Sequence, residues 1–330
     1  MMAPTQALYV LLATLSIGGS GRWDYITCDA KNDLLYVPRT THVMVISPAD
    51  GKLVADIDGL GETHGVALVP ELNRGFVSDS AGDGSVTIFD LKSHAVLGRI
   101  AAADDADAIV YDPASLHVLV GCGDAKKVLA IDAGVDPAKG QAAAALDVGG
   151  KPEFIACDGN GTAWINVADK NEVMEFDTRQ MKQIARWPTA PGTKPTSMAI
   201  DPAHHRLFVG CRGKLLVVFD TETGKIVQTL PIGKGVDATA LDDGKVLVSC
   251  NDATLWIFTE GPDGQLTLLQ TLTTVPGAKT LAVNPLTHTV YLPTADFTPP
   301  PADTPNAKPQ PVEGTFKILV AAPTKDDAAK

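Results

Sequence analysis

The sequence lacks the features that mark helical, disulfide-stabilised or membrane-spanning chains. No segment keeps a helical period, and no apolar run is long enough to span a membrane. The five cysteines are an odd number with no CxxC pair, so we expect them to fill small apolar spaces in the core and not to form disulfides. Strand formers and turn residues dominate, with 30 glycines and 23 prolines, which favours an all-β chain of many short strands.

An excess of positive charge is also missing. The 27 basic residues are outnumbered by 39 acidic ones, which gives a net charge of −12. This balance makes nucleic acids and anionic membrane surfaces poor partners, and it suits cationic ligands or metal ions better. The same acidity also serves solubility alone, so it favours a cation without requiring one.

The first apolar segment does not have the form of a secretory leader. Residues 7–17 (ALYVLLATLSI) have no basic residues before them and no evident cleavage site, so we expect no signal peptide in this chain. They match LLQTLTTV (268–275) and IVQTLPIG (226–233), which end later repeats. We therefore predict that residues 7–17 form a strand of the folded protein.

One short pattern occurs seven times. Its first copy is WDYITCD (23–29), in which a polar residue is followed by a variable, a large apolar, a small and another apolar residue. The remaining copies are THGVALVP (63–70), ADAIVYDP (106–113), PEFIACD (152–158), PTSMAIDP (195–202), VDATALDD (236–243) and AKTLAVNP (278–285). The leading polar residues follow one another at intervals of 40, 43, 46, 43, 41 and 42 residues. A period near 40 made of short strands is typical of propeller blades.

Each copy opens a unit of four predicted strands, A to D. The fifth unit shows the order most clearly: PTSMAIDP (195–202), RLFVGC (206–211), KLLVVFD (214–220) and KIVQTLPIG (225–233), with turn residues between them. We therefore predict an all-β fold, a seven-bladed β-propeller of four-stranded antiparallel blades that forms a single domain over residues 7–322.

The seventh unit has no strand D before the chain ends. Residues 7–17 supply the missing strand, so the last blade joins both termini and closes the ring. Closure hides the sheet edges that would otherwise pair with other chains. The segment beyond, 323–330, is expected to be a disordered tail.

A Pro-rich loop at 295–314 separates strands B and C of the seventh unit. In a propeller, the B–C and D–A connections share the face at which strand A begins, so we expect this loop over the mouth of the central channel. Two interpretations stay open. The loop is either a lid over a site or an insertion that acts only as a spacer.

Strands B and C share a sequence pattern, and examples are LLYVPRTTHVMVIS (34–47) and RLFVGCRGKLLVVFD (206–220). This pattern resembles that of the YVTN-repeat seven-bladed propellers, the YncE-like bacterial proteins. The resemblance covers about residues 7–322 and is specific for architecture but weak for activity. It implies a periplasmic or secreted location. The family includes surface and periplasmic proteins of unknown role and relatives of quinoprotein dehydrogenase heavy chains.

The candidate functional residues occupy the leading position of the innermost strands. The third and fifth positions are apolar and the fourth is mostly small, which fits a core near a crowded axis. Six of the seven leading residues are ionisable, and Thr196 is the exception. The six are Asp24, His64, Asp107, Glu153, Asp237 and Lys279.

These side chains are expected to converge at the top of the channel, where four carboxylates repel one another unless a cation neutralises them. We predict a divalent metal held by Asp24, Asp107, Glu153 and Asp237, with His64 as a further ligand or a general base. Carboxylates alone favour Ca²⁺ or Mg²⁺, and a histidine among them also permits Zn²⁺ or Mn²⁺. The alternative is that each polar residue bonds local backbone amides or channel water.

Further ligand contacts are predicted around this ring. Tyr25, Trp23 and Phe154 would line its wall, although aromatic residues beside a core more often pack. Arg39 and Arg212 end B strands near the same face, and Thr196 belongs to the leading column.

The first functional hypothesis is a metal-dependent hydrolase of an ester, lactone or phosphoester. In it His64 takes a proton and Lys279 stabilises the developing oxyanion. The second is a non-catalytic protein that binds a ligand or partner and holds a structural cation. A quinoprotein-like oxidoreductase ranks last, because no cofactor-forming tryptophan pair or haem motif is present. No GxSxG elbow or phosphate-binding loop is present either. We expect a monomer that meets a small-molecule substrate or ligand.

Overall fold

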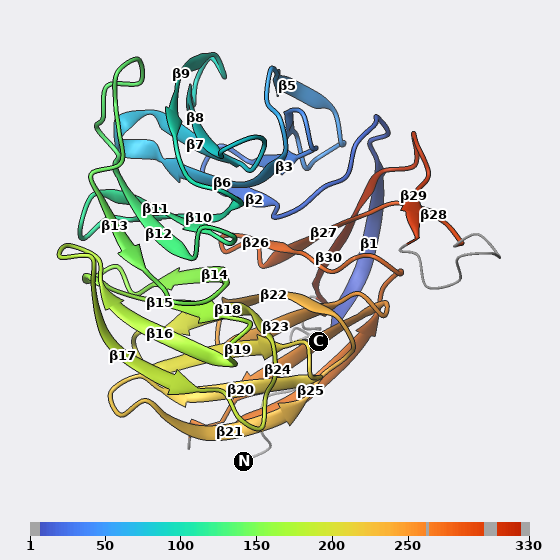
Figure 1. Ribbon diagram of the computed structural model, residues 1–330. Helices are drawn as coiled ribbons and strands as arrows, with labels where there is room; N and C mark the ends of the chain where they lie inside the picture. The colour runs from blue at the N-terminus through green and yellow to red at the C-terminus, as the bar shows by residue number, and fades with distance from the viewer. Residues whose placement is uncertain (1–6, 262–263, 300–308, 325–330) are drawn as a thin grey trace.

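The computed structural model describes residues 7–261, 264–299 and 309–324. The chain forms seven four-stranded antiparallel sheets around a central axis (Figure 1). The predicted all-β, seven-bladed propeller is therefore confirmed. Across the described residues, the one helical element is the 3-10 turn η1 (Pro70–Leu72). These residues contain no helix of the length and apolarity needed to cross a membrane.

Blades 1 to 3 follow the predicted strand order. Blade 1 contains β2 (Thr27–Asp29), β3 (Leu34–Pro38), β4 (Val43–Ile46) and β5 (Leu53–Ile57). Blade 2 contains β6 (Thr63–Val69), β7 (Arg74–Asp79), β8 (Ser85–Asp90) and β9 (Val96–Ala101). Blade 3 contains β10 (Ala106–Asp112), β11 (His117–Cys122), β12 (Lys127–Asp132) and β13 (Ala144–Asp147).

Blades 4 to 6 repeat the same arrangement. Blade 4 contains β14 (Pro152–Cys157), β15 (Thr162–Val167), β16 (Glu172–Asp177) and β17 (Lys182–Pro188). Blade 5 contains β18 (Pro195–Asp201), β19 (Arg206–Cys211), β20 (Leu215–Asp220) and β21 (Lys225–Pro231). Blade 6 contains β22 (Val236–Asp242), β23 (Lys245–Cys250), β24 (Thr254–Glu260) and β25 (Leu266–Thr273).

Blade 7 is built from both ends of the chain, as the sequence predicts. It contains β26 (Ala282–Asn284), β27 (Thr289–Thr294), β30 (Lys317–Pro323) and β1 (Tyr9–Ser16). The outer strand β1 pairs antiparallel with β30, from Tyr9 opposite Pro323 to Ser16 opposite Lys317. Gln270 on β25 adds a clasp, because its side-chain amide accepts a hydrogen bond from the Tyr9 backbone N–H and donates one to the Tyr9 carbonyl, each at 2.8 Å.

The hydrophobic core is divided among the blade interfaces. Seven clusters of buried apolar residues each join two neighbouring blades, and one of them packs Ile26 and Val37 of the blade 1 side against Tyr291 and Ile318 of blade 7. The ring is therefore closed by packing as well as by strand pairing. All five cysteines are free, and Cys122, Cys211 and Cys250 are fully buried.

The innermost strands of blades 1 and 7 are shorter than the repeat predicts. Strand β2 begins at Thr27 and β26 at Ala282, so Asp24 and Lys279 precede their strands. The reason in blade 1 is that the Tyr25 backbone N–H donates to the carbonyl of His64 in blade 2, at 3.0 Å, and not to its own sheet.

The Pro-rich loop is partly described. Its ends pair as the short strands β28 (Phe297–Thr298) and β29 (Gln310–Pro311), which project beyond the ring at the right of Figure 1. Phe297 packs against Trp23 with ring centroids 6.0 Å apart. Residues 300–308 lie outside the described part, so the lid interpretation stays a prediction. The predicted tail, 323–330, is described only at Pro323, which belongs to β30, and at Thr324.

Candidate metal centre

A β-bulge accompanies the leading residue in each of blades 2 to 6. The pairing of the innermost strand with its neighbour shifts at Thr63/Val66, Ala106/Ile109, Pro152/Ile155, Pro195/Ser197 and Val236/Ala238. Each interval contains the leading residue, respectively His64, Asp107, Glu153, Thr196 and Asp237. A bulge breaks the strict alternation of side chains and re-aims the extra residue. The repeated bulge thus places these polar groups apart from the apolar columns that follow them.

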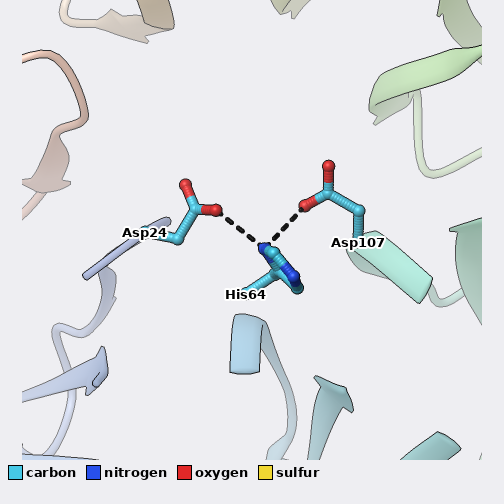
Figure 2. Close-up of side chains that lie close together, drawn as sticks. All are labelled: Asp24, His64 and Asp107. Carbon is cyan, nitrogen blue, oxygen red and sulfur yellow. Dashed lines mark hydrogen bonds and ion pairs between the residues drawn. The ribbon is translucent and has the colours of Figure 1, made fainter. Parts of the chain in front are cut away.

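Asp24, His64 and Asp107 form one compact cluster. Nδ1 of His64 lies 2.8 Å from Oδ2 of Asp24 and 3.4 Å from Oδ1 of Asp107 (Figure 2). The two carboxylates approach the imidazole from opposite sides in this view. One ligand atom from each residue lies within 4.8 Å of the other two, which is the spacing of groups that share a metal ion. The three side chains are 18 to 24% exposed.

The other imidazole nitrogen of His64 forms a hydrogen bond with a serine. Nε2 of His64 lies 2.9 Å from Oγ of Ser80, which follows β7. Burial opposes the charged imidazole, but the hydrogen bond to Asp24 and the charges of Asp107 and Asp24 outweigh it and raise the pKa of His64 to about 9. At neutral pH a proton therefore occupies Nδ1 unless a metal replaces it.

Asp107 is the least satisfied member of the cluster. Its Oδ1 is buried without a hydrogen-bond partner among the described residues, since the contact with His64 lacks hydrogen-bond geometry. Burial raises the pKa of this carboxyl well above its usual range, the charge of Asp24 raises it further, and His64 opposes the shift. An unpaired carboxylate oxygen beside a histidine nitrogen fits the donor set of a divalent metal.

A second cluster joins Asp237 to two cations. Oδ1 of Asp237 accepts a hydrogen bond from Nη2 of Arg212 at 2.8 Å, and Oδ2 contacts Nζ of Lys279. The Asp237 side chain is 8% exposed, whereas those of Arg212 and Lys279 are 48% and 36% exposed. Burial opposes the charge of Lys279, but Asp237 and Asp24 raise its pKa. One carboxylate thus holds two cations, and this cluster keeps a net charge of +1.

Glu153 and Tyr25 complete the ring of polar side chains formed by the leading residues and their neighbours. Burial raises the pKa of Glu153, with Arg212 opposing and Asp237 adding to the shift. Burial also raises the pKa of the Tyr25 hydroxyl well above its usual range, and the charges that add to this shift are those of all four ring carboxylates. The Tyr25 ring meets Phe154 edge to face, with centroids 5.4 Å apart. Tyr25 therefore lies among the leading residues of several blades.

The structure does not gather the predicted metal ligands at one point. It divides them into Asp24, His64 and Asp107 on one side and Asp237 with Lys279 on the other. The sequence-based charge count placed one cation, Lys279, among four carboxylates. It did not include Arg212 in that balance, because Arg212 ends a B strand and lies outside the leading column. Ser80 was also missed, since a lone serine after a strand carries no sequence signal.

Three residues predicted to contact a ligand, Thr196, Trp23 and Arg39, make their contacts outside both charged clusters. Thr196 is buried, and its Oγ1 lies 3.3 Å from the carbonyl of Lys194 and 3.5 Å from that of Val236. Trp23 packs on Phe297 and on Phe316 of the seventh blade. Thr196 therefore follows the alternative in which a leading residue bonds local backbone.

Arg39 supports the backbone of an N-terminal loop. Arg39 is 1% exposed. Its guanidinium donates hydrogen bonds to the carbonyls of Gly18, Ser20 and Gly21 at 2.8 to 3.1 Å. It also lies over the Phe316 ring, 3.9 Å from the ring centroid. These hydrogen bonds engage both Nη1 and Nη2 within the fold, away from the leading residues.

Comparison with known proteins establishes the architecture and not the activity. No family model and no curated protein matches the chain. Among solved structures, a chain of the "Crystal Structure of Mitotic Checkpoint Complex" matches with a TM-score of 0.76 and 14% identity, over 96% of this chain and 95% of that one. In all, 1782 chains of solved structures match, so the fold is too widespread to indicate a function. The protein is a seven-bladed β-propeller.

Proposed function

We propose that the protein binds one divalent metal ion at Asp24, His64 and Asp107 and uses it to hydrolyse an ester, lactone or phosphoester at the channel mouth. The observation that carries this proposal is the convergence of Asp24 Oδ2, Asp107 Oδ1 and His64 Nδ1 within 4.8 Å. Three protein ligands leave coordination positions for water and substrate, as in catalytic sites.

The tautomer of His64 supports a cation at this point. If Nε2 carries the single proton of the neutral ring and donates a hydrogen bond to Oγ of Ser80, the lone pair of Nδ1 faces two carboxylates. That arrangement is repulsive unless a proton or a metal lies between them. A histidine bonded through its second nitrogen is also the usual support of a metal ligand. Mixed nitrogen and carboxylate donors suit Zn²⁺ or Mn²⁺ better than Ca²⁺.

When bound, a divalent metal acidifies water and polarises a substrate oxygen. The residues of the chain then divide the remaining tasks. His64 is assigned as a ligand and not as the general base first predicted, because both of its nitrogens are engaged. Glu153, whose pKa is raised by burial, is assigned the proton transfer. Arg212 and Lys279, with a net charge of +1 after pairing with Asp237, stabilise the developing negative charge.

A panel of aryl esters, lactones and phosphoesters, assayed with added Zn²⁺ or Mn²⁺ and with chelator, tests this function. We expect hydrolysis that needs the metal and that falls at least a hundredfold in His64→Ala and Glu153→Gln. A Leu12→Ser variant, changed on an exposed outer strand, is the matched control and keeps full activity. Turnover that survives both chelation and His64→Ala would exclude the proposal.

A second candidate is a non-catalytic YncE-like propeller of the periplasm or cell surface that binds an anionic ligand. The Asp237 cluster favours it, since Arg212 and Lys279 keep a net charge of +1 after pairing with that carboxylate and need no metal. This candidate predicts binding of small carboxylates or phosphate that depends on Arg212 and is independent of metal.

A further inference from the structure

A chamber on the propeller axis adjoins the charged ring. It has a volume of about 120 Å³. Tyr25 and Phe154, which belong to the ring, are also part of its wall. The remaining lining residues come from blades 1, 2, 3, 4, 6 and 7: Ile26, Thr27, Gly65, Val66, Ala108, Ile109, Ile155, Ala238, Thr239 and Leu281.

The chamber exists because the residues directly after the leading positions are mostly small. Gly65, Ala108 and Ala238 occupy this place in blades 2, 3 and 6, where a larger side chain would fill the axis. Tyr25 and Phe154 occupy it in blades 1 and 4 and meet edge to face at 5.4 Å. The small residues leave the space, and the aromatic pair forms the part of its wall next to the charged groups.

The lining side chains offer few free polar groups. Of its hydroxyl groups, Thr27 Oγ1 donates to the Val66 carbonyl at 2.8 Å, and Thr239 Oγ1 bonds Ser197 Oγ at 2.7 Å. Both hydroxyls are therefore satisfied within the sheets, and the other lining side chains, apart from the Tyr25 hydroxyl at the ring, are apolar. A chamber whose lining side chains are mainly apolar favours apolar guests.

We propose that this chamber receives a short apolar group of the substrate while the bond to be cleaved lies at the ring above it. The inference rests on the proposed function and names its substrate class: esters or lactones with an aliphatic chain of about three to five carbons. An engineered apolar cavity of roughly 150 Å³ binds benzene, so a chamber of about 120 Å³ suits a slightly smaller group.

The first arm of the test uses xenon and needs no turnover. Methyl-labelled protein is titrated with xenon under pressure, and shifts of the Val66, Ile109 and Leu281 methyl groups are recorded. We expect saturable shifts in the wild type and their loss in Ala108→Leu and Ala238→Leu, which fill the chamber from different blades. Ala145→Leu, on the exposed outer strand β13, is the matched control and keeps the shifts.

The second arm compares aryl acetate, butyrate and octanoate esters. We expect kcat/KM of the wild type to be highest for the butyrate ester. In a filled variant that keeps the wild-type melting profile, the ratio of kcat/KM for butyrate to that for acetate should fall at least tenfold. Absence of xenon shifts in the wild type, or shifts unchanged in both filled variants, overturns the chamber even if esters are hydrolysed. Xenon binding without hydrolysis of any ester overturns the proposed function and leaves an apolar binding chamber.

Discussion

Nδ1 of His64 and Oδ2 of Asp24 lie 2.8 Å apart although the two residues are 40 positions apart in the sequence and belong to neighbouring blades. One period of the repeat thus brings two leading residues into contact. A similar interval places Asp107 against the same nitrogen of His64, at 3.4 Å (Figure 2). The site is a product of the ring, since no single blade contains more than one of its three members.

The metal-free protein should lose stability as the pH rises from 6.5 to 9. The pKa of His64 is about 9 in the folded state and near 6.5 when unfolded, so the stabilisation is complete below pH 6.5 and disappears through pH 9. The shift corresponds to on the order of 3 kcal/mol. Urea unfolding across this range in chelator measures it. His64→Gln should reduce the slope between pH 6.5 and 9, and a slope as steep as that of the wild type would contradict the assignment.

Metal binding should show the opposite dependence on pH. The metal must displace the proton on Nδ1, so the apparent affinity is expected to rise by about tenfold per pH unit up to pH 9. Calorimetric titration with Zn²⁺ or Mn²⁺ at pH 6, 7 and 8 measures this slope. A flat affinity over this range would mean that His64 is not a ligand.

Asp237→Asn should destabilise the fold more than the loss of one ion pair suggests. The substitution leaves Arg212 and Lys279 facing each other without their shared carboxylate, with an expected cost of about 2–4 kcal/mol. Asp237→Asn combined with Lys279→Met should recover part of that loss. Denaturant unfolding of both single variants and the double variant gives the coupling energy, and strictly additive losses would show that the contact is not a stabilising one.

Arg39→Ala should reduce stability and leave metal binding unchanged. The substitution removes three hydrogen bonds to the carbonyls of residues 18, 20 and 21 and the contact with the Phe316 ring, for about 3 kcal/mol. Arg39→Lys should recover little, because an ammonium group cannot reproduce the planar fork. A loss of metal or ligand binding at full stability would restore the predicted ligand contact.

Removal of residues 1–16 should lower the melting temperature by more than 10 °C. The deletion takes away β1, exposes β30 as an open edge and removes the fully buried Tyr9. Leu12→Ser, a change at a side chain that is 63% exposed on the same strand, should alter stability by less than about 0.5 kcal/mol. A truncated protein that melts like the full chain would refute closure through β1.

The fold was predictable because its signals are local and repeated. The alternation of large and small residues, the turn residues and the missing last strand together predicted seven blades and the pairing of β1 with β30. The site was predictable only in part. The leading column predicted His64 and its neighbours, but the β-bulges at five of the seven leading residues cannot be read from residue type. The pairing of Asp237 with Arg212 depends on a side chain that directly follows the second strand of another blade.

The metal content of the purified protein, measured by elemental analysis after equilibration with Zn²⁺ or Mn²⁺, tests the central claim most directly. We predict one ion per chain in the wild type and in Lys279→Met, whose side chain lies in the second cluster, and none in His64→Ala or Asp107→Asn. A wild-type protein without bound metal, or an equal content in His64→Ala, would contradict the metal centre and leave only the charge-paired ring.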